Sequence, residues 1–295
     1  MSTATGYLRA IIAPGFFSSE SVRVALIVAA VVAVASAVVG VFTVIRGQSF
    51  AGHALSDFGA TGGAGAYLAG IGPLWGFVIM TTAAAAAMEL IGVERARGRD
   101  VATGVVVGVG LGLSALFLYF DTTVTSTTGA TISILFGSMF VINPANVPWI
   151  VVLTAVSLII TVALARPLLL SAVSVDIAAA RRVPVRLVGV AYLFALALAV
   201  ALSSLTIGAI LSTALLIGPA ATALRITARP ATAVVVAALI GVACSWLGIL
   251  LAYDSFHWPP AGHGWPVSFF VVSLIFVGYL LAGLVRQRDH RRVEA

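Results

Sequence analysis

Long apolar runs constrain this chain more than any other feature. Several of them contain about 20 residues, the length that an α-helix needs to cross a hydrocarbon core about 30 Å thick. Only 9% of the 295 residues are charged, whereas soluble domains carry about 25%, and the mean hydropathy is +1.15. Because backbone polar groups in lipid must be satisfied within the segment, the runs predict helices. The chain is therefore expected to be a membrane protein.

The order of the runs predicts an all-α, polytopic transmembrane bundle. We expect about eight or nine helices, with short re-entrant or broken ones among them, in a single transmembrane domain over 1–295. The segment ILFGSMFVI, at 134–142, is too short to span and predicts a partial helix. Residues 187–224 form one uncharged stretch that predicts two crossings with a turn near 203–208. The other runs are 22–45, 53–71, 74–91, 101–120, 149–165, 231–253 and 267–285.

The net charge of +6 reflects membrane orientation and does not indicate nucleic-acid binding. All 16 basic residues are Arg, and they cluster in short loops and at run ends. Cytoplasmic loops are enriched in this way, so the Arg-rich C-terminal tail is expected inside. Residues 166–186 carry four Arg and predict a cytoplasmic segment with a short helix that ends before Pro184.

Sequence motifs for enzymatic chemistry are missing. A phosphate-binding P-loop needs a Lys, and the chain has none. The H-E-x-x-H, G-x-S-x-G and G-x-G-x-x-G patterns do not occur either. The single cysteine, Cys244, permits no disulfide within the chain and is expected to be a small core residue. The chain is therefore not expected to be an enzyme.

The stretch FAGHALSDF, at 50–58, places His53 and Asp57 four residues apart in an apolar setting. On a helix the two share one face, and an acid inside a membrane is usually paired or functional. One nitrogen and one or two oxygens make half of a site for Zn²⁺ or Mn²⁺. The simpler alternatives are a hydrogen bond between the two side chains, or a solvated loop after Arg46. The glycines that follow, including Gly62 and Gly63, permit close packing or an irregular backbone beside a cavity.

Several segments together resemble the permease subunits of zinc and manganese ATP-binding-cassette importers. They lie in the family's order from about 38 to 283: VVGVFTVIRGQSFAGHALSDFGATGG, then ILFGSMFVI, then LLLSAVSVDIAAARRVPVR, and IGAILSTALLIGPAATALRI, which is the most specific. The family usually reads Asp-Ala-Leu-Ser-His where this chain reads His-Ala-Leu-Ser-Asp. The resemblance thus puts His53 at the family's Asp position and Asp57 at its His position, as metal ligands.

The resemblance also implies an assembly. A cytoplasmic ATPase is expected to contact the coupling segment, 166–186, at Asp176, Ala180, Arg181 and Arg182, although the Gly that the family carries beyond the Asp is missing. Path or gate residues are expected at Gly62, Gly63, Gly218 and Pro219, where the proline permits local unwinding. A second copy would complete the translocation path.

Outside the membrane, an extracytoplasmic metal-binding protein is expected to dock on loops that include 254–266. His257 and His263 in that loop are either weak metal acceptors or ordinary surface histidines. The resemblance implies a bacterial cytoplasmic (inner) membrane, no resident cofactor, ATP on the partner subunit, and Zn²⁺ or Mn²⁺ as cargo. Zinc is placed first because the pair contains an imidazole.

Three other functions stay open from the residues. A permease for a metal chelate, such as a siderophore complex or cobalamin, would need a wider path and no coordinating pair. An ion-coupled secondary transporter would use Asp57 as a relay and need no ATPase. A scaffolding membrane subunit would transport nothing.

Overall fold

A computed structural model describes residues 16–91, 99–124, 128–137, 139–256, 258 and 264–293 of the chain. Every regular element within these ranges is helical, as expected. The predictions made for His257 and His263 fall outside the described residues.

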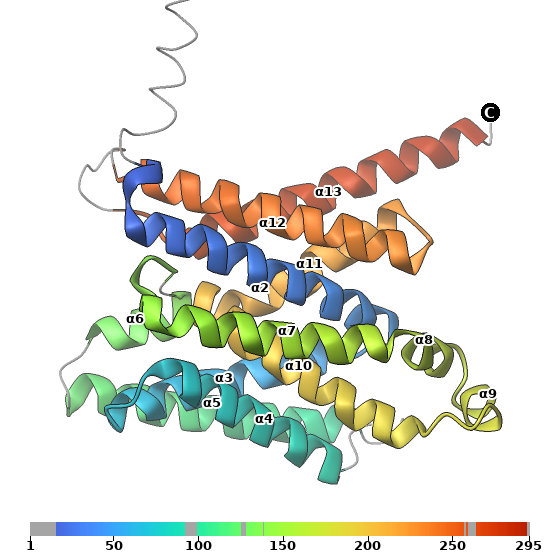
Figure 1. The fold of residues 1–295 in the computed structure, drawn as a ribbon, viewed down its shortest axis with the longest axis horizontal. Coiled ribbons are helices and arrows are strands. Elements are labelled where there is room, and N and C mark those ends of the chain that lie inside the picture. Colours follow the sequence, from blue (N-terminus) through green and yellow to red (C-terminus); the bar gives the residue numbers. More distant parts are fainter. Residues whose placement is uncertain are drawn as a thin grey trace, which may run out of the picture.

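Nine long helices lie side by side and run roughly along one axis of the described structure (Figure 1). They are α2 (Glu20–Ile45), α3 (Ser49–Leu68), α4 (Pro73–Ile91), α5 (Arg99–Thr123), α7 (Val147–Ala163), α10 (Val185–Ile207), α11 (Ala209–Ile226), α12 (Pro230–Ser255) and α13 (Val267–Val293). The shorter elements are α6 (Thr128–Phe136), α8 (Ala165–Val173), α9 (Val175–Ala180), η1 (Phe16–Ser18), η2 (Met139–Val141) and η3 (Pro144–Asn146).

Seven of the described helices are long and apolar enough to cross a membrane: α2, α4, α7 with η3, α10, α11, α12 and α13. The helices α3 and α5 are as long but carry more Gly and polar residues. Together the nine match the expected eight or nine helices, and the prediction of an all-α polytopic bundle is confirmed.

The helix α3 contacts mainly four other long helices. It packs against α4, α5, α10 and α11, whereas α2 packs mainly against α7, α10, α11 and α12. Most of the α3 side chains are buried. The helix that carries the His53–Asp57 pair is thus enclosed by protein on most sides.

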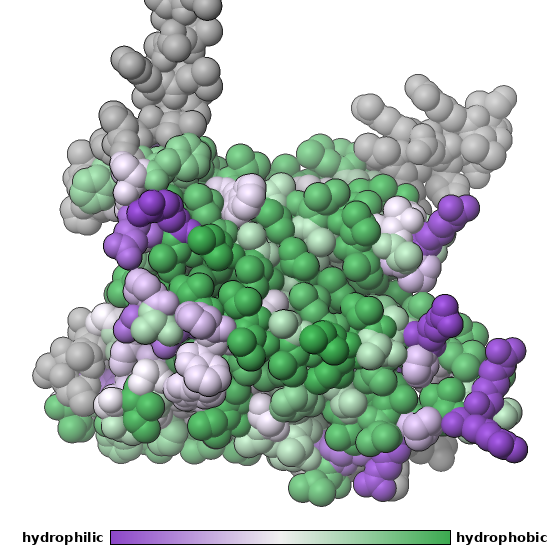
Figure 2. All heavy atoms as spheres, viewed as in Figure 1, coloured by the Kyte–Doolittle hydropathy of each residue, from purple (hydrophilic) through white to green (hydrophobic). Residues whose placement is uncertain are grey.

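The surface divides into a broad apolar belt and two more hydrophilic ends (Figure 2). The end that carries α8 and α9 also holds Arg46 at the end of α2, Arg186 at the start of α10 and Arg225 at the end of α11 (Figure 1). By the positive-inside rule this end is cytoplasmic. The helix α3 therefore begins at the cytoplasmic end and runs outward.

The long uncharged stretch 187–224 divides where the sequence predicted. The helix α10 ends at Ile207 and α11 begins at Ala209, so the turn is one residue, Gly208, with φ +97°. The helix α11 then continues through Pro219. The local unwinding that the proline permits does not occur in α11.

The short segment before residue 142 contains a partial helix, as predicted, but its boundaries differ. The helix α6 begins at Thr128, within the polar Thr-rich stretch, and ends at Phe136. Gly137 follows with φ +85° and breaks the helix inside the apolar letters ILFGSMFVI. The prediction placed the helix too late because it followed hydropathy, and the positive φ at Gly137 was not visible in that pattern.

These two helix breaks lie against each other. A Cβ on Gly137 would collide with the backbone of Thr206 and Ile207, and a Cβ on Gly208 would collide with the backbone of Leu135 and Phe136. Both glycines also hold a positive φ that L-residues rarely adopt. The contact between α6 and the α10–α11 turn therefore requires glycine on both sides.

We expect Gly208→Ala to destabilise the protein by at least about 2 kcal/mol, because the positive φ alone costs an L-residue about 1–2 kcal/mol and the collision adds to it. The measurement is thermal unfolding of the purified protein in detergent. Gly278→Ala is the matched control, since a Cβ at Gly278 meets nothing within 4 Å. Equal melting temperatures for both variants would contradict the close contact.

Candidate functional site

His53 and Asp57 both lie in α3, one turn apart, with 3.9 Å between His53 Nε2 and Asp57 Oδ2. The Asp57 side chain is 10% exposed and the His53 side chain 46% exposed. The pair is thus helical, and the alternative of a solvated loop is wrong. The separation also exceeds the usual 2.7–3.2 Å of a hydrogen bond, so the alternative of a hydrogen bond between the two side chains does not hold in this geometry.

Asp57 Oδ2 is buried and has no hydrogen-bond partner in the structure. A buried carboxylate oxygen without a partner loses its hydration and gains nothing in return. Most buried polar atoms in native proteins have a hydrogen-bond partner, so an exception needs an explanation. A positively charged species beside Asp57 and the half-exposed His53 would satisfy it.

Hydroxyl groups on either side of Asp57 fix α3 to its neighbours. The Ser56 hydroxyl donates to the Ala209 carbonyl at 2.5 Å and contacts the Ser212 hydroxyl at 2.6 Å and the Ser204 hydroxyl at 3.2 Å. The residue preceding Asp57 therefore ties α3 to the α10–α11 turn.

On the other side, the Ser114 hydroxyl of α5 donates to the Asp57 carbonyl at 3.0 Å and contacts the Thr61 hydroxyl at 2.7 Å. The Thr61 hydroxyl also reaches the Gly110 carbonyl at 2.9 Å. Sequence reasoning missed Ser56, Thr61 and Ser114 as positioning residues. The available signal was a hydroxyl one residue before and four residues after an acid in a membrane helix.

The predicted path glycines of α3 lie in helix contacts. A Cβ on Gly62 would collide with the backbone of Gly76 in α4, and a Cβ on Gly63 would lie 2.7 Å from the Phe77 ring. Close approach of small residues is the usual way that membrane helices associate. This packing accounts for both glycines within one chain, and their place beside a path stays a prediction.

Gly218 and Pro219 of α11 are also packed. A Cβ on Gly218 would collide with the Ile275 side chain of α13. Pro219 is buried, and its ring lies 3.8 Å from the Cβ position of Gly241 in α12. The role of Gly218 and Pro219 in gating likewise stays a prediction.

The coupling segment folds as two short helices, where one was expected. Ser174 ends α8 and caps α9, accepting a hydrogen bond from the Ile177 amide through its hydroxyl. The four predicted ATPase contacts, Asp176, Ala180, Arg181 and Arg182, are all exposed. Three neighbouring apolar side chains, Val173, Val175 and Ile177, are at least half exposed. The segment thus presents both charged and apolar groups to a partner.

Arg182 occupies the position where the resemblance implies that a glycine is missing. It follows the end of α9 with φ +59°, the left-handed conformation that glycine usually supplies after a helix. The Val183 amide donates to the Ala178 carbonyl and the Arg182 amide to the Ala179 carbonyl, which closes the helix end. The turn therefore keeps its shape with an arginine, at a strain of about 1–2 kcal/mol.

Two polar contacts tie this segment to the membrane helices. Arg46, at the end of α2, donates to the Ser171 hydroxyl of α8 at 2.8 Å and lies over the Tyr192 ring of α10. Arg186, at the start of α10, pairs with Glu89 at the end of α4 at 3.2 Å. These contacts connect α8 to α2, and α10 to both α2 and α4.

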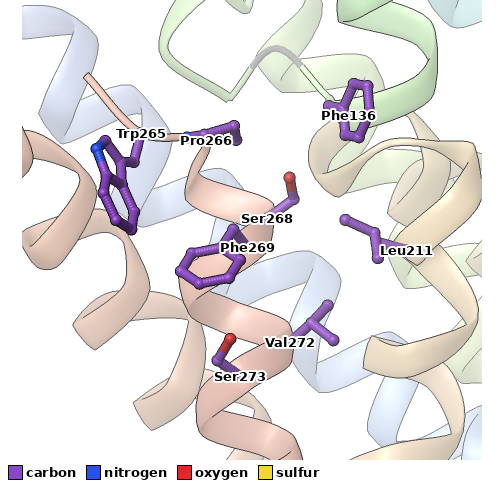
Figure 3. A pocket seen from close by; sticks show the side chains of 8 residues that line it. All are labelled: Phe136, Leu211, Trp265, Pro266, Ser268, Phe269, Val272 and Ser273. Carbon is purple, nitrogen blue, oxygen red and sulfur yellow. The ribbon is translucent and has the colours of Figure 1, made fainter. Parts of the chain in front are cut away.

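At the outer end, a pocket of about 450 Å³ lies between α13, the first turn of α11 and the end of α6. Figure 3 shows Trp265 and Phe269 of the α13 end together with Phe136 and Leu211 around it. This pocket adjoins the part of the 254–266 loop that the structure describes.

The described residues contain no group of three or more His, Cys, Asp or Glu side chains that could hold a metal ion. A tetrahedral zinc site takes four ligands, and magnesium or calcium sites take more. The pair in α3 is thus half of a coordination shell.

A bundle with this topology, an Arg-rich cytoplasmic segment and a polar pair on a buried helix defines a multi-pass membrane transport subunit. A family model described as ABC 3 transport family matches residues 18–282. The chain belongs to this family and is therefore the membrane subunit of a bacterial ABC importer, without ATPase activity of its own. The resemblance seen in the sequence is confirmed, and the alternative of an ion-coupled secondary transporter is wrong.

Two of the similar relatives are named for manganese. The manganese transport system membrane protein MntC of Listeria monocytogenes is 27% identical over 81% of this chain and 84% of its own length. The manganese import system permease protein ScaB of Streptococcus parasanguinis is 26% identical over 78% and 81%.

Two solved structures share the fold. PsaBC from Streptococcus pneumoniae in complex with Fab matches with a TM-score of 0.77 at 24% identity, over 91% of this chain and 92% of that chain. An inward-facing conformation of a putative metal-chelate type ABC transporter matches with a TM-score of 0.71 at 16% identity, over 98% and 90%.

Proposed function

We propose that this chain is the permease of an ATP-driven importer of divalent metal ions, and that His53 and Asp57 line the ion's route. The observation that carries the proposal is the buried Asp57 Oδ2, which accepts no hydrogen bond, 3.9 Å from a half-exposed imidazole on the same helix. Intramembrane acids are costly and mark ion pathways in many transporters. A chelate permease would have no use for a coordinating pair, which argues against that alternative.

The cargo we place first is Mn²⁺, with Zn²⁺ second. An imidazole beside a carboxylate suits both ions, so the expectation of zinc rested on the imidazole alone. The relatives named above are manganese transporters, and they share most of the chain's length. Their names support manganese over zinc.

A second copy of the chain supplies the missing ligands in this proposal. Gly104, Gly108 and Gly112 of α5 are exposed, with open space where each Cβ would be. The Thr61–Ser114 and Asp57–Ser114 contacts set α5 level with α3, so this stripe lies at the depth of the His53–Asp57 pair. Such a stripe permits close packing of membrane helices. Packing of two α5 helices would bring two pairs to one depth.

The remaining partners follow from membership in an ABC family. An ATPase subunit would bind the exposed face of α8 and α9, where Asp176, Ala180, Arg181 and Arg182 lie. An extracytoplasmic metal-binding protein would dock at the outer end, near the pocket between α11 and α13. No permanent cofactor is required in this chain, because ATP is bound by the partner.

We expect His53→Ala and Asp57→Asn each to lower metal accumulation at least tenfold at matched expression. The measurement is elemental analysis of cells that lack their own manganese and zinc uptake and express the permease with its ATPase and binding protein. Asp57→Asn keeps the shape of the side chain and removes its charge. Glu20→Gln, an exposed carboxylate at the start of α2, is the control and should transport as the wild type does.

The same assay decides the cargo. Accumulation of manganese by the wild type supports our order, and accumulation of zinc reverses it. Normal transport by both pair variants would remove the pair from the route. No accumulation of either metal by the wild type would count against the importer function itself.

The dimer face has its own test. In a Cys244→Ala background, we expect Gly108→Cys to form a disulfide-linked dimer in membranes, because a disulfide requires Cα atoms within about 7 Å. Leu239→Cys, an exposed position on α12, is the control and should stay monomeric on a denaturing gel. Linkage through Leu239→Cys and not through Gly108→Cys would move the interface away from α5.

The coupling face is tested by co-purification. We expect Ile177→Glu to reduce recovery of the ATPase with the tagged permease about tenfold, because a charge would replace a half-exposed apolar contact on α9. Arg229→Glu, an exposed cytoplasmic position before α12, should recover the ATPase normally. Equal recovery from both variants would place the ATPase contact elsewhere.

A further inference from the structure

A cavity of about 400 Å³ lies at the cytoplasmic end, between the end of α2, the α8–α9 segment and the start of α10. Two arginines, Arg46 and Arg186, line it from α2 and α10, and Gln48 and Ser171 add polar groups. It is separate from the His53–Asp57 pair, whose residues do not line it, and five of its seven lining residues belong to the coupling segment.

The chemistry of the lining favours an anion. Guanidinium groups match phosphate geometry with paired N–H donors. Gln48 is 5% exposed, and its carboxamide oxygen already accepts from Arg46 Nε at 3.4 Å, which leaves the amide hydrogens as donors. The cavity also reaches the first residues of α10, where the amino end of a long helix favours negative charge.

The seven lining residues include two guanidinium groups and no carboxylate. Glu89 pairs with Arg186 but does not line the cavity. Asp176, which follows the lining residue Val175, does not line it either. The Arg46 contacts with Ser171 and Gln48 hold its guanidinium group in place at the cavity wall.

We propose that this cavity binds a phosphate group, carried by an anionic phospholipid of the inner leaflet or by a free phosphate compound. Basic pockets between membrane helices on the cytoplasmic side are typical headgroup sites. The bound group would bridge α2, α8 and α10, which are the elements that hold the coupling segment. Its effect on coupling rests on the proposed importer function, but the binding itself does not.

The test uses the purified full-length permease in nanodiscs that contain equal phosphatidylglycerol and phosphatidylcholine. Native mass spectrometry after release into detergent counts the phospholipids that each chain retains. A second arm titrates inorganic phosphate against the delipidated protein and follows its melting temperature. Neither readout needs the ATPase or transport, so a failure here is distinct from failure of the importer function.

Ala172→Leu is the decisive variant, because Ala172 lines the cavity and a larger side chain fills it without changing any charge. The double variant Glu89→Gln/Arg186→Gln removes one guanidinium together with its partner. Arg229→Gln is the control for general attraction, since Arg229 is an exposed cytoplasmic arginine outside the lining.

We expect the wild type and Arg229→Gln to retain about one phosphatidylglycerol per chain, and both cavity variants to retain it at least tenfold less. Saturable stabilisation by inorganic phosphate, lost in Ala172→Leu, would support the site with a free phosphate compound as its occupant. Equal binding by Ala172→Leu and the wild type would overturn the proposal. Binding of neither probe by the wild type would overturn it too.

Discussion

The close approach of α3 to its neighbours is the constraint on which the rest of the structure depends. In a membrane, lipid tails are as apolar as side chains, so helices gain little from burying apolar surface and must pack closely or form hydrogen bonds. The glycines of α3 permit close packing against α4. Hydrogen bonds join Ser56 to the α10–α11 turn and Thr61 to α5. The same contacts fix the depth and rotation of the His53–Asp57 face. A helix with larger side chains at 62 and 63 would place the pair differently.

The paired breaks at Gly137 and Gly208 follow from the same requirement. Non-helical backbone at membrane depth is tolerated only where protein covers it. Each break lies against the other. The Ser56 hydroxyl donates a hydrogen bond to the carbonyl of Ala209, the residue that follows Gly208. The helix that carries the candidate ligands therefore also stabilises the turn between α10 and α11. Asp57 is thus adjacent in sequence to the residue that holds this turn.

Hydropathy and charge predicted the class of fold and the number of long helices, because these depend on segment averages. They also located the division of 187–224 near Gly208. They did not predict that α6 starts at Thr128, because its first residues are polar. They left open whether Gly62, Gly63 and Gly218 pack or line a path, because both kinds of glycine look the same in sequence; the structure shows contacts with α4 and α13. The sequence did not show the positive φ of Arg182 either, although the missing family glycine pointed to this turn.

The order of the pair has a consequence for the ion that uses it. The helix α3 runs outward from the cytoplasmic end, so Asp57 lies about 6 Å closer to the outside than His53, at 1.5 Å per residue. On the proposed route, an ion that enters from outside would therefore meet the buried carboxylate first and the half-exposed imidazole next. The family's usual order would present the imidazole first. Carboxylates suit Mn²⁺ better than imidazoles do. On the proposed route, the inverted order thus places the harder oxygen ligand at the entry side and the softer nitrogen ligand at the exit side.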